Sequence, residues 1–357
     1  MIRLATVFSG IGAIEQALKK NKLDYTIVFA CDNGERIVNI SEEQKEEILS
    51  FNNEKRNEIV KKIYDETGKQ NLMKISYMSN YHLKEENWFE DIRFIDGKPF
   101  ENQVDLFVGG SPCQSFSMIG KRKGLEDARG TLFYDYARLV SEIKPKVFIY
   151  ENVVGMLNHD NGNTWETIKN VFESLDYDIH WNILNSKDYG IPQDRKRLFV
   201  VGFKKEKDFH FPKPVDLVTT MFDYLEKGPI SERYYLGKKG FDFVTLTGKG
   251  RAKVNQKIIR TQKANQQFNW NGDFVFEKLQ TVKNNSAIMN RAHIGNYQGE
   301  VGVIRQLTPR ECLRLMGFDD DFKITVAVNH MYRQAGNSIV VNVLQAIMDS
   351  ILEVEKL

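Results

Sequence analysis

The chain has 357 residues, of which 41% are hydrophobic and 27% charged, and its 50 Lys and Arg against 48 Asp and Glu leave a formal net charge of +2. This balance is typical of a folded globular protein with a large core and excludes a disordered chain. No signal sequence opens the chain and no apolar run reaches membrane-span length, so we expect a cytoplasmic protein that contacts no membrane. Cys31, Cys113 and Cys312 are too widely spaced for a disulfide framework or paired zinc ligands, and we expect no metal.

The first two predicted strands frame a ligand-binding turn. The pattern predicts a strand at 2–8, a turn at Ser9-Gly10-Ile11-Gly12, a helix at 13–20 and a second strand at 25–30. Glycines at a strand-to-helix turn let a ligand approach the backbone and the helix N-terminus. Asp32 follows Gly12 by about twenty residues, the separation at which an acid binds ribose hydroxyls in dinucleotide-type folds. Together these features predict a site for an adenosine-containing cofactor.

A charge-dense segment, residues 41–86, separates the second strand from the third. Its apolar residues recur at helical spacing and predict one or two surface helices inserted there. A short third element follows at 88–92, with Asp91 near its end. The common role for such an aspartate is a solvated loop residue, and the alternative is an acceptor for an adenine amino group.

Residues 104–117 begin as a buried strand and then turn at Gly109 and Gly110. Pro112 fixes its own φ and cannot continue a sheet, so the chain beside Cys113 is stiff. A thiol on a rigid turn at the carboxyl end of a parallel strand lies where α/β sheets bind ligands. We interpret Cys113 as a candidate nucleophile, and a small buried thiol in a turn is the alternative.

The next segments add an acid to the same edge of the sheet. Residues 118–130 are basic and punctuated by glycine, which predicts a loop that closes over a ligand. A helix at 131–143 leads to a strand at 146–150, and Glu151-Asn152-Val153 follows that strand. Because neighbouring parallel strands end in one crevice, we expect Glu151 beside Cys113.

Two arginines precede the last predicted strand. A helix at 164–175 and strands at 179–184 and 198–203 flank the run Gln193-Asp194-Arg195-Lys196-Arg197. Arg195 and Arg197, two apart at the start of a strand, should point the same way. Two guanidiniums aimed at one site suit a carbonyl or phosphate oxygen. Solvated surface arginines are the alternative.

Positive charge gathers in the region between residues 238 and 263. One acid, Asp242, accompanies eight bases there: Lys238, Lys239, Lys249, Arg251, Lys253, Lys257, Arg260 and Lys263. Such a cluster is either a phosphate-contacting surface or a solvated face. Further on, an apolar stripe over 339–351 predicts a core-facing helix, with Asn337 and Ser338 capping its N-terminus.

In order and spacing, the Pro-Cys-Gln, Glu-Asn-Val and Gln-x-Arg-x-Arg segments resemble the cytosine-C5 DNA methyltransferases of bacterial restriction-modification systems. The match continues through 305–312, 315–318 and 334–340 and omits 41–86 and about 204–304. The resemblance implies an α/β fold, a Rossmann-like S-adenosylmethionine-dependent methyltransferase sheet with helices on both faces, plus a smaller target-recognition domain. It implies a catalytic domain at 1–203 with the insertion at 41–86, a recognition domain at 204–304, and a C-terminal segment, 305–357, that returns to the catalytic domain.

The resemblance also implies the reaction, a methyl transfer from S-adenosylmethionine to C5 of a flipped-out cytosine in a short double-stranded DNA sequence. A covalent bond between Cys113 and C6 makes C5 nucleophilic. Glu151 would engage N3 of the cytosine, and for that role we expect a raised pKa. Arg195 would donate to O2, with Arg197 in support.

Matching positions extend the implied site to the cofactor and the DNA. The cofactor residues would be Phe8, Ser9, Gly10, Ile11, Gly12, Asp32, Asn33, Asp91, Ile92, Ser111, Pro112, Leu132, Asn337 and Ser338. The DNA contacts would be Gln114, Ser117, Ile119, Lys121, Arg122, Lys123, Lys249, Arg251, Lys253, Arg260 and Thr281. Many relatives have an aromatic residue where this chain has Asn33.

Three other functions fit parts of the sequence. A nicotinamide-dependent dehydrogenase explains the first two strands but gives no role to Cys113, Glu151 or the arginines. A tRNA-directed relative typically has Pro-Pro-Cys-Gln where this chain has Ser111-Pro112-Cys113-Gln114, and a non-catalytic DNA-binding relative is expected to lose Cys113 or Glu151. We therefore expect a monomeric DNA methyltransferase of a prokaryotic cell or its phage, with a restriction endonuclease acting on the same site as its partner.

Overall fold

The computed structural model describes residues 1–112, 132–246, 252–265 and 270–357. The chain forms two compact units. The first contains 1–184, 196–213 and 343–357, and the second contains 185–195 and 214–342. These units do not coincide with the expected boundaries after 203 and 304, because 305–342 belongs to the second unit. The chain passes between the units four times.

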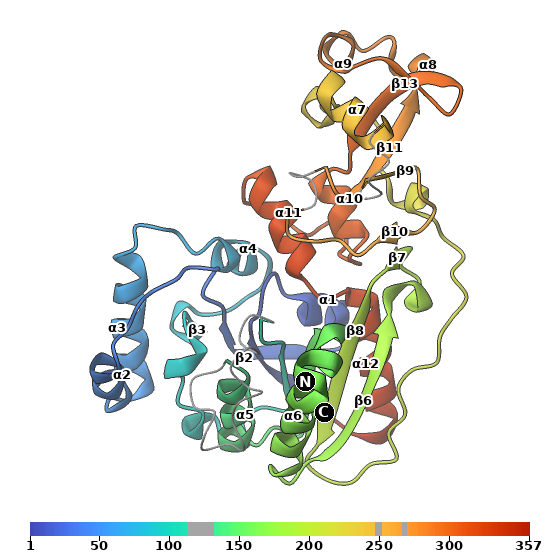
Figure 1. The fold of residues 1–357 in the computed structure, drawn as a ribbon. Helices are drawn as coiled ribbons and strands as arrows, with labels where there is room; N and C mark the ends of the chain where they lie inside the picture. Colours follow the sequence, from blue (N-terminus) through green and yellow to red (C-terminus); the bar gives the residue numbers. More distant parts are fainter. Residues whose placement is uncertain (113–131, 247–251, 266–269) are drawn as a thin grey trace. The chain divides into compact units, whose positions relative to one another are not determined.

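A seven-stranded sheet in the order β3-β2-β1-β4-β5-β8-β6 forms the centre of the first unit (Figure 1). The strands are β1 Ile2–Val7, β2 Tyr25–Cys31, β3 Trp88–Phe89, β4 Leu106–Gly109, β5 Val147–Val153, β6 Asp178–Asn185 and β8 Lys196–Phe203. The neighbours from β3 to β5 pair in parallel, whereas β8 runs antiparallel to β5. Buried apolar runs such as Val147–Tyr150 are typical of strands covered on both faces.

Helices cover both faces of this sheet, as predicted for the fold class. The helices that pack on it are α1 Ala13–Lys20, α5 Leu132–Ile143, α6 Asn163–Glu173 and α12 Val341–Val354. Aromatic side chains from α5, α6 and the strands, among them Phe133, Phe148 and Phe172, form the core on one face. α1 and α12 lie on the opposite side (Figure 1).

Residues 41–86 form three helices, and the prediction of one or two was wrong. They are α2 Glu42–Leu49, α3 Asn53–Asp65 and α4 Leu72–Asn80. Ser41, Asn52 and Asn71 each cap the N-terminus of one helix by accepting a hydrogen bond from a backbone N–H three residues on. These three capping side chains lie within 31 residues, and each begins a separate helix. The spacing of apolar residues alone does not reveal these helix starts. We call this part of the chain the helical segment 41–86.

The second unit holds two small sheets and five helices among its described residues. Its strands are β7 Gln193–Asp194, β9 Lys253–Val254, β10 Ile259–Arg260, β11 Asp273–Lys278, β12 Gly295–Tyr297 and β13 Glu300–Gln306. Its helices are α7 Lys238–Leu246, α8 Leu279–Val282, α9 Ser286–Arg291, α10 Pro309–Arg314 and α11 Val328–Asn337. β12-β13-β11-β9 form one sheet and β10-β7 the other. The buried Arg305 guanidinium pairs with Glu277 and Glu311, which ties β11 and β13 to α10.

Short 3-10 helices connect several of these elements. They are Glu85–Asn87, Ile92–Phe94, Lys98–Phe100, Val154–Gly162, Ser186–Tyr189, Met221–Tyr224 and Glu232–Tyr234. Within the described residues, the run Val328–Val354 is long and apolar enough to span a membrane by length and composition. Half of its most apolar window is buried, and it is broken between α11 and α12, so it has the character of core helices.

Glu15 on α1 is fully buried, and burial raises its pKa to about 7. Because this folded-state pKa exceeds the unfolded one, the folded state keeps a proton that the unfolded state loses, and stability falls as pH rises from about 4.5 to 7. We expect this carboxyl to remove about 3 kcal/mol from the free energy of unfolding across that window. Glu15→Gln should abolish the loss, measured by urea unfolding at pH 5 and pH 8.

The exposed Glu54, in the first turn of α3, provides a control for that experiment. Glu54→Gln should leave the pH dependence of unfolding as it is in the unmodified protein. If Glu15→Gln keeps the full loss of stability between pH 5 and pH 8, the buried carboxyl is not its source.

Candidate active site

The turn after β1 brings backbone groups close to open space. Phe8 and Gly10 adopt left-handed backbone conformations, with φ of 53° and 54°. At Gly10 an added Cβ would meet no atom closer than the Phe8 carbonyl oxygen, 3.9 Å away. The Ser9 hydroxyl accepts from the Cys31 N–H at 3.1 Å and so fixes this turn to the end of β2. The turn therefore leaves room for a ligand beside Gly10, as the sequence predicts.

Asp32 joins the turn after β1 to the loop after β2. Its carboxylate accepts hydrogen bonds from the backbone N–H groups of Gly10 at 2.9 Å and Gly34 at 2.8 Å. Burial nevertheless raises the pKa of Asp32, against the lowering effect of these two donors. Each oxygen has capacity for a further hydrogen bond, so the carboxylate can still receive a hydroxyl donor.

The Asn33 side chain forms hydrogen bonds within its own loop. Its side-chain oxygen accepts from the Glu35 N–H at 2.9 Å, and its amide donates to the Arg36 carbonyl at 3.2 Å. A planar ring that could stack on a ligand is absent at this position, and the amide is already used within the loop.

Asp91, after β3, is buried and heavily hydrogen-bonded. The Tyr64 hydroxyl donates to its Oδ2 at 2.9 Å, and the Arg93 backbone and guanidinium donate to both oxygens at 2.6 to 3.1 Å. The expected role as an acceptor for an adenine amino group therefore requires that one Arg93 contact is given up. Ile92 follows it in a 3-10 helix and is buried in the core.

The stem of the predicted nucleophile turn packs directly on β5. A Cβ at Gly110 would lie 2.5 Å from the Glu151 carbonyl oxygen, so only glycine allows this approach. The Ser111 hydroxyl hydrogen-bonds the Tyr150 hydroxyl at 2.6 Å, and the Asn152 amide donates to the Ser111 carbonyl at 2.9 Å. The chain thus leaves β4 against the strand that carries Glu151, as the order of strands predicts.

The residues that follow Pro112 lie outside the described residues. They include the predicted nucleophile Cys113, the predicted DNA contacts Gln114, Ser117, Ile119, Lys121, Arg122 and Lys123, and the predicted closing loop 118–130. Leu132, a predicted cofactor contact, begins α5 and is half-buried.

Glu151 lies within β5, whereas the sequence placed it after the strand. β5 continues to Val153 because β8 pairs with it antiparallel as far as the register Val153↔Arg197. Across this pair the Arg197 Nε lies 3.1 Å from Glu151 Oε1, and both side chains are mostly buried. A carboxylate and a guanidinium therefore meet at the end of the sheet, next to Gly110, in the segment that leads from β4 to Cys113.

Arg195 and Arg197 have different partners in the structure. Arg195 lies between β7 and β8 in the second unit, so strand alternation does not relate it to Arg197. Its buried guanidinium donates to the main-chain carbonyls of Gln262 at 2.8 Å, Gly336 at 3.2 Å and Ser338 at 2.8 Å. These bonds give Arg195 a structural role within the second unit.

Other predicted residues of the second unit have local partners. Asn337 is the exposed last residue of α11 and Ser338 its C-cap, so the predicted N-cap of the following helix was wrong. Arg260 donates to the Asn271 and Gly272 carbonyls at 2.9 and 3.0 Å, and Thr281 donates to the Lys278 carbonyl. Lys253 is exposed on β9, and Lys249 and Arg251 lie outside the described residues.

No sequence motif marks several residues that shape this site as site residues. Tyr64, Asn71 and Tyr81, from the helical segment 41–86, bond the loops that carry Asp91, Asp32 and Gly12. Buried tyrosine hydroxyls are indistinguishable from ordinary core residues in a sequence. The capping motif at Asn71 was the one detectable feature, and it predicts a helix start, not a contact with Asp32.

Comparison with known proteins places the chain in a family. A model of the family described as C-5 cytosine-specific DNA methylase matches residues 47–353. The type II methyltransferase M.HhaI of Haemophilus parahaemolyticus is 38% identical over 279 residues, covering 76% of this chain and 81% of that protein. The type II methyltransferase M.HpaII of Haemophilus parainfluenzae is 35% identical over 294 residues, covering 74% and 76%.

Solved structures share the fold at low sequence identity. The Dnmt2 methyltransferase of S. pombe is 18% identical with a TM-score of 0.65, and 99% of each chain is covered. A DNMT2 mutant of Spodoptera frugiperda is 17% identical with a TM-score of 0.68, covering 99% of this chain and 100% of that one. From the family match and the two bacterial relatives, the chain belongs to the C-5 cytosine-specific DNA methylase family.

Proposed function

We propose that this protein transfers a methyl group from S-adenosylmethionine to C5 of a flipped-out cytosine in a short double-stranded DNA sequence, as the modification enzyme of a restriction-modification system. The observation that carries the proposal is the Glu151–Arg197 pair, which lies beside Gly110 in the segment that leads to Cys113. In a family of C-5 cytosine methylases, this pair and the thiol of Cys113 supply the groups that activation of C5 requires.

The loops after β1, β2 and β3 fit an adenosine-type methyl donor. Open space lies beside Gly10, and the Asp32 carboxylate retains acceptor capacity for ribose hydroxyls. Phe8 and Ser9 shape the same turn, and Asp91 and Ile92 complete the set after β3. When bound, S-adenosylmethionine supplies an electrophilic methyl group on a sulfonium sulfur.

Cys113 would add to C6 of the cytosine. Carbon 5 of cytosine is a poor nucleophile, and addition of a thiolate at C6 makes it enamine-like, which divides one difficult step into easier ones. After methyl transfer, loss of the C5 proton expels the thiolate and restores the aromatic ring. Because C6 is inaccessible inside a duplex, the target base must leave the stack, at a cost of a few kcal/mol.

Glu151 and Arg197 would each contact one atom on the polar edge of the base, Glu151 at N3 and Arg197 at O2. N3 and O2 of cytosine are adjacent, so the groups that engage them must be neighbours, and these two side chains are 3.1 Å apart. The Arg195 guanidinium already donates to three carbonyls, so we assign the O2 contact to Arg197 instead. A cytosine that takes the Arg197 hydrogen bond at O2 frees the Glu151 carboxyl to engage N3.

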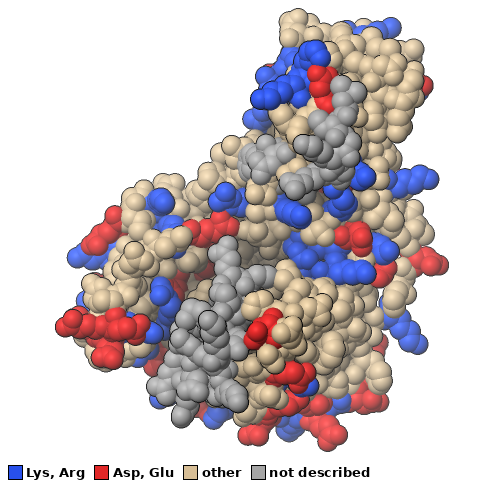
Figure 2. Space-filling view, in the orientation of Figure 1, with Lys and Arg blue, Asp and Glu red and all other residues tan. Residues whose placement is uncertain are grey.

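The second unit would read the DNA. It contains the basic cluster between 238 and 263, and Figure 2 shows Lys and Arg side chains gathered over the region of α7, where Lys238 and Lys239 are exposed. A positive surface supplies sequence-independent affinity for phosphates. Lys253 and Arg260 are described members of the cluster, although Arg260 also pairs with Asp273.

Bisulfite sequencing tests this function directly. DNA from cells that express the chain and lack other cytosine methylases should resist conversion at one cytosine of one short motif. Cells with an empty vector are the control. Conversion of every cytosine would contradict the proposal, and protection of tRNA cytosines instead of DNA would favour the tRNA-directed relative.

A further inference from the structure

Three buried polar side chains of the helical segment 41–86 contact the loops after β1, β2 and β3 of the first unit. Tyr64 lies on α3, Asn71 caps the N-terminus of α4, and Tyr81 follows the C-terminus of α4. Their exposed fractions are 1%, 7% and 8%. Burying a hydroxyl or amide without a partner costs free energy, so the contacts of these groups identify what they stabilise.

Tyr81 holds the turn after β1. Its hydroxyl donates to the Ile11 carbonyl at 3.1 Å and to the Gly12 carbonyl at 2.8 Å. Gly12 packs against the ring, because a Cβ there would lie 2.1 Å from a ring carbon of Tyr81. The position of the Gly10–Gly12 turn therefore depends on this side chain.

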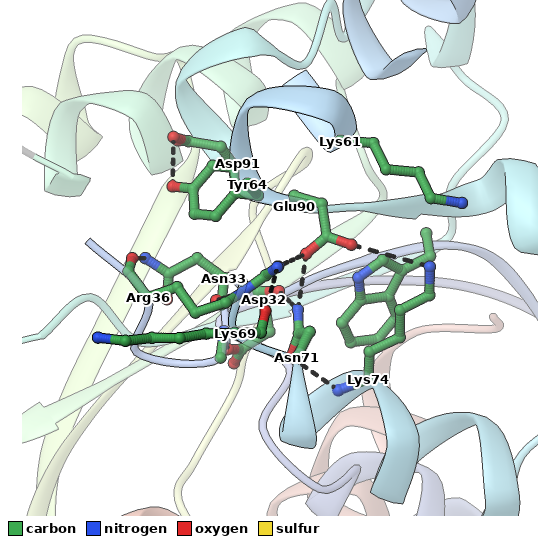
Figure 3. A network of polar contacts seen from close by, with 12 residues as sticks. Asp32, Asn33, Arg36, Lys61, Tyr64, Lys69, Asn71, Lys74, Glu90 and Asp91 are labelled. Atoms are coloured by element: carbon green, nitrogen blue, oxygen red, sulfur yellow. Dashed lines mark hydrogen bonds and ion pairs between the residues drawn. The ribbon is translucent and has the colours of Figure 1, made fainter. Parts of the chain in front are cut away.

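Asn71 holds the loop after β2 (Figure 3). Its amide donates to the Asp32 carbonyl at 2.7 Å and to Glu90 Oε2 at 2.7 Å, so it bridges the loops after β2 and β3. Its side-chain oxygen meanwhile accepts from the Lys74 N–H at 3.0 Å as the cap of α4. Glu90 also pairs with the buried Arg36, which completes the bridge.

Tyr64 holds the loop after β3. Its hydroxyl donates to Asp91 Oδ2 at 2.9 Å, and the Arg36 guanidinium lies over its ring, 4.8 Å from the centroid (Figure 3). Asp91 is thus fixed from both sides, by Tyr64 from the helical segment and by Arg93 from its own loop.

We propose that the helical segment 41–86 is a positioning element for the methyl-donor site, in which Tyr81, Asn71 and Tyr64 each hold one of the three loops that form it. The inference rests on the proposed function in taking these loops as the S-adenosylmethionine site. Loops that are held in the bound conformation lose less entropy on binding, which raises affinity. The contacts described above for these side chains go to the loops after β1, β2 and β3, so the segment sets donor affinity rather than the rate of chemistry.

The variants Tyr64→Phe, Asn71→Leu and Tyr81→Phe in the full chain test this role. Each should raise the Kd for S-adenosylmethionine, measured by calorimetry, about tenfold, which corresponds to about 1.4 kcal/mol. The KM for the donor should rise with it, while kcat at saturating donor and the Kd for DNA stay within about twofold. Both tyrosine variants remove one oxygen atom and keep the ring that packs in the core.

Two matched controls separate positioning from general destabilisation. Tyr177→Phe removes a buried hydroxyl that donates to the Pro145 carbonyl at 2.7 Å, away from the three loops. Asn52→Ala removes the N-cap of α3 in the same helical segment. Both should leave the Kd for the donor unchanged.

The possible outcomes are distinct. If the unmodified protein does not bind S-adenosylmethionine, the proposed function fails. If it binds and the tyrosine variants bind equally well, or if the controls weaken binding as much, the positioning role is wrong. Should Asn71→Leu not fold, the two tyrosine variants still decide.

Discussion

Cys113→Ala is expected to abolish methyl transfer while leaving DNA affinity largely intact. The other two cysteines are fully buried, and burial raises the pKa of the Cys31 and Cys312 thiols well above the ordinary value, which leaves them un-ionised and unreactive. Cys113 is therefore the one cysteine left to attack C6. Transfer of labelled methyl groups to a duplex oligonucleotide measures the loss.

A duplex containing 5-fluorocytosine should trap the unmodified protein as a covalent adduct. Fluorine at C5 cannot leave as a proton does, so the bond between Cys113 and C6 persists after methyl transfer. Cys312→Ala should still form the adduct and Cys113→Ala should not. Turnover or adduct formation by Cys113→Ala would refute the covalent mechanism.

Glu151→Gln and Arg197→Lys are expected to give the next largest losses. Glutamine cannot act as the acid at N3, and general acid catalysis contributes about 10²- to 10⁴-fold in rate. Lysine cannot keep both the Glu151 contact and a hydrogen bond to O2, and loss of one such donor costs about 10²- to 10³-fold. Single-turnover rates at saturating donor measure both effects.

Arg195→Lys distinguishes the two arginines. Because Arg195 donates to carbonyls within the second unit, its replacement leaves buried acceptors unsatisfied and should lower Tm by several degrees. Arg197→Lys should lower the rate with little change in Tm. The opposite pattern, a stable Arg195→Lys enzyme without activity, would return the O2 contact to Arg195.

Much of the first unit follows from local sequence. The helix Ala13–Lys20 was predicted to the residue, and the apolar strands were predicted within a few residues, because buried runs and flanking glycines are local signals. The sequence does not predict the full extent of β5, because the last three residues of this strand are strand only through pairing with β8. That pairing joins residues more than forty positions apart, which periodicity does not detect.

The residues of the candidate site likewise fall into those that a local sequence pattern predicts and those that depend on how distant segments pack. Asp32 is predicted as a site residue from its spacing after Gly12, and Glu151 from its place after an apolar run. The different partners of the two arginines could not be predicted, because the alternation of side chains applies within a strand and Arg195 lies before β8 begins. The contacts of Tyr64, Asn71 and Tyr81 depend on how three helices pack, which no short pattern encodes.

The four passages of the chain between its units limit how this protein can be re-engineered. A fragment of 214–342 alone lacks 185–195, and with it β7, which is the strand partner of β10, and Arg195, which ties the end of α11 to Gln262. Grafting the second unit of a relative onto this catalytic scaffold therefore calls for two transplanted pieces, the short one as well as the long one. A hybrid that exchanges the long piece alone would pair it with the short piece of a different protein. The β7–β10 pairing and the Arg195 contacts would then join segments of different origin.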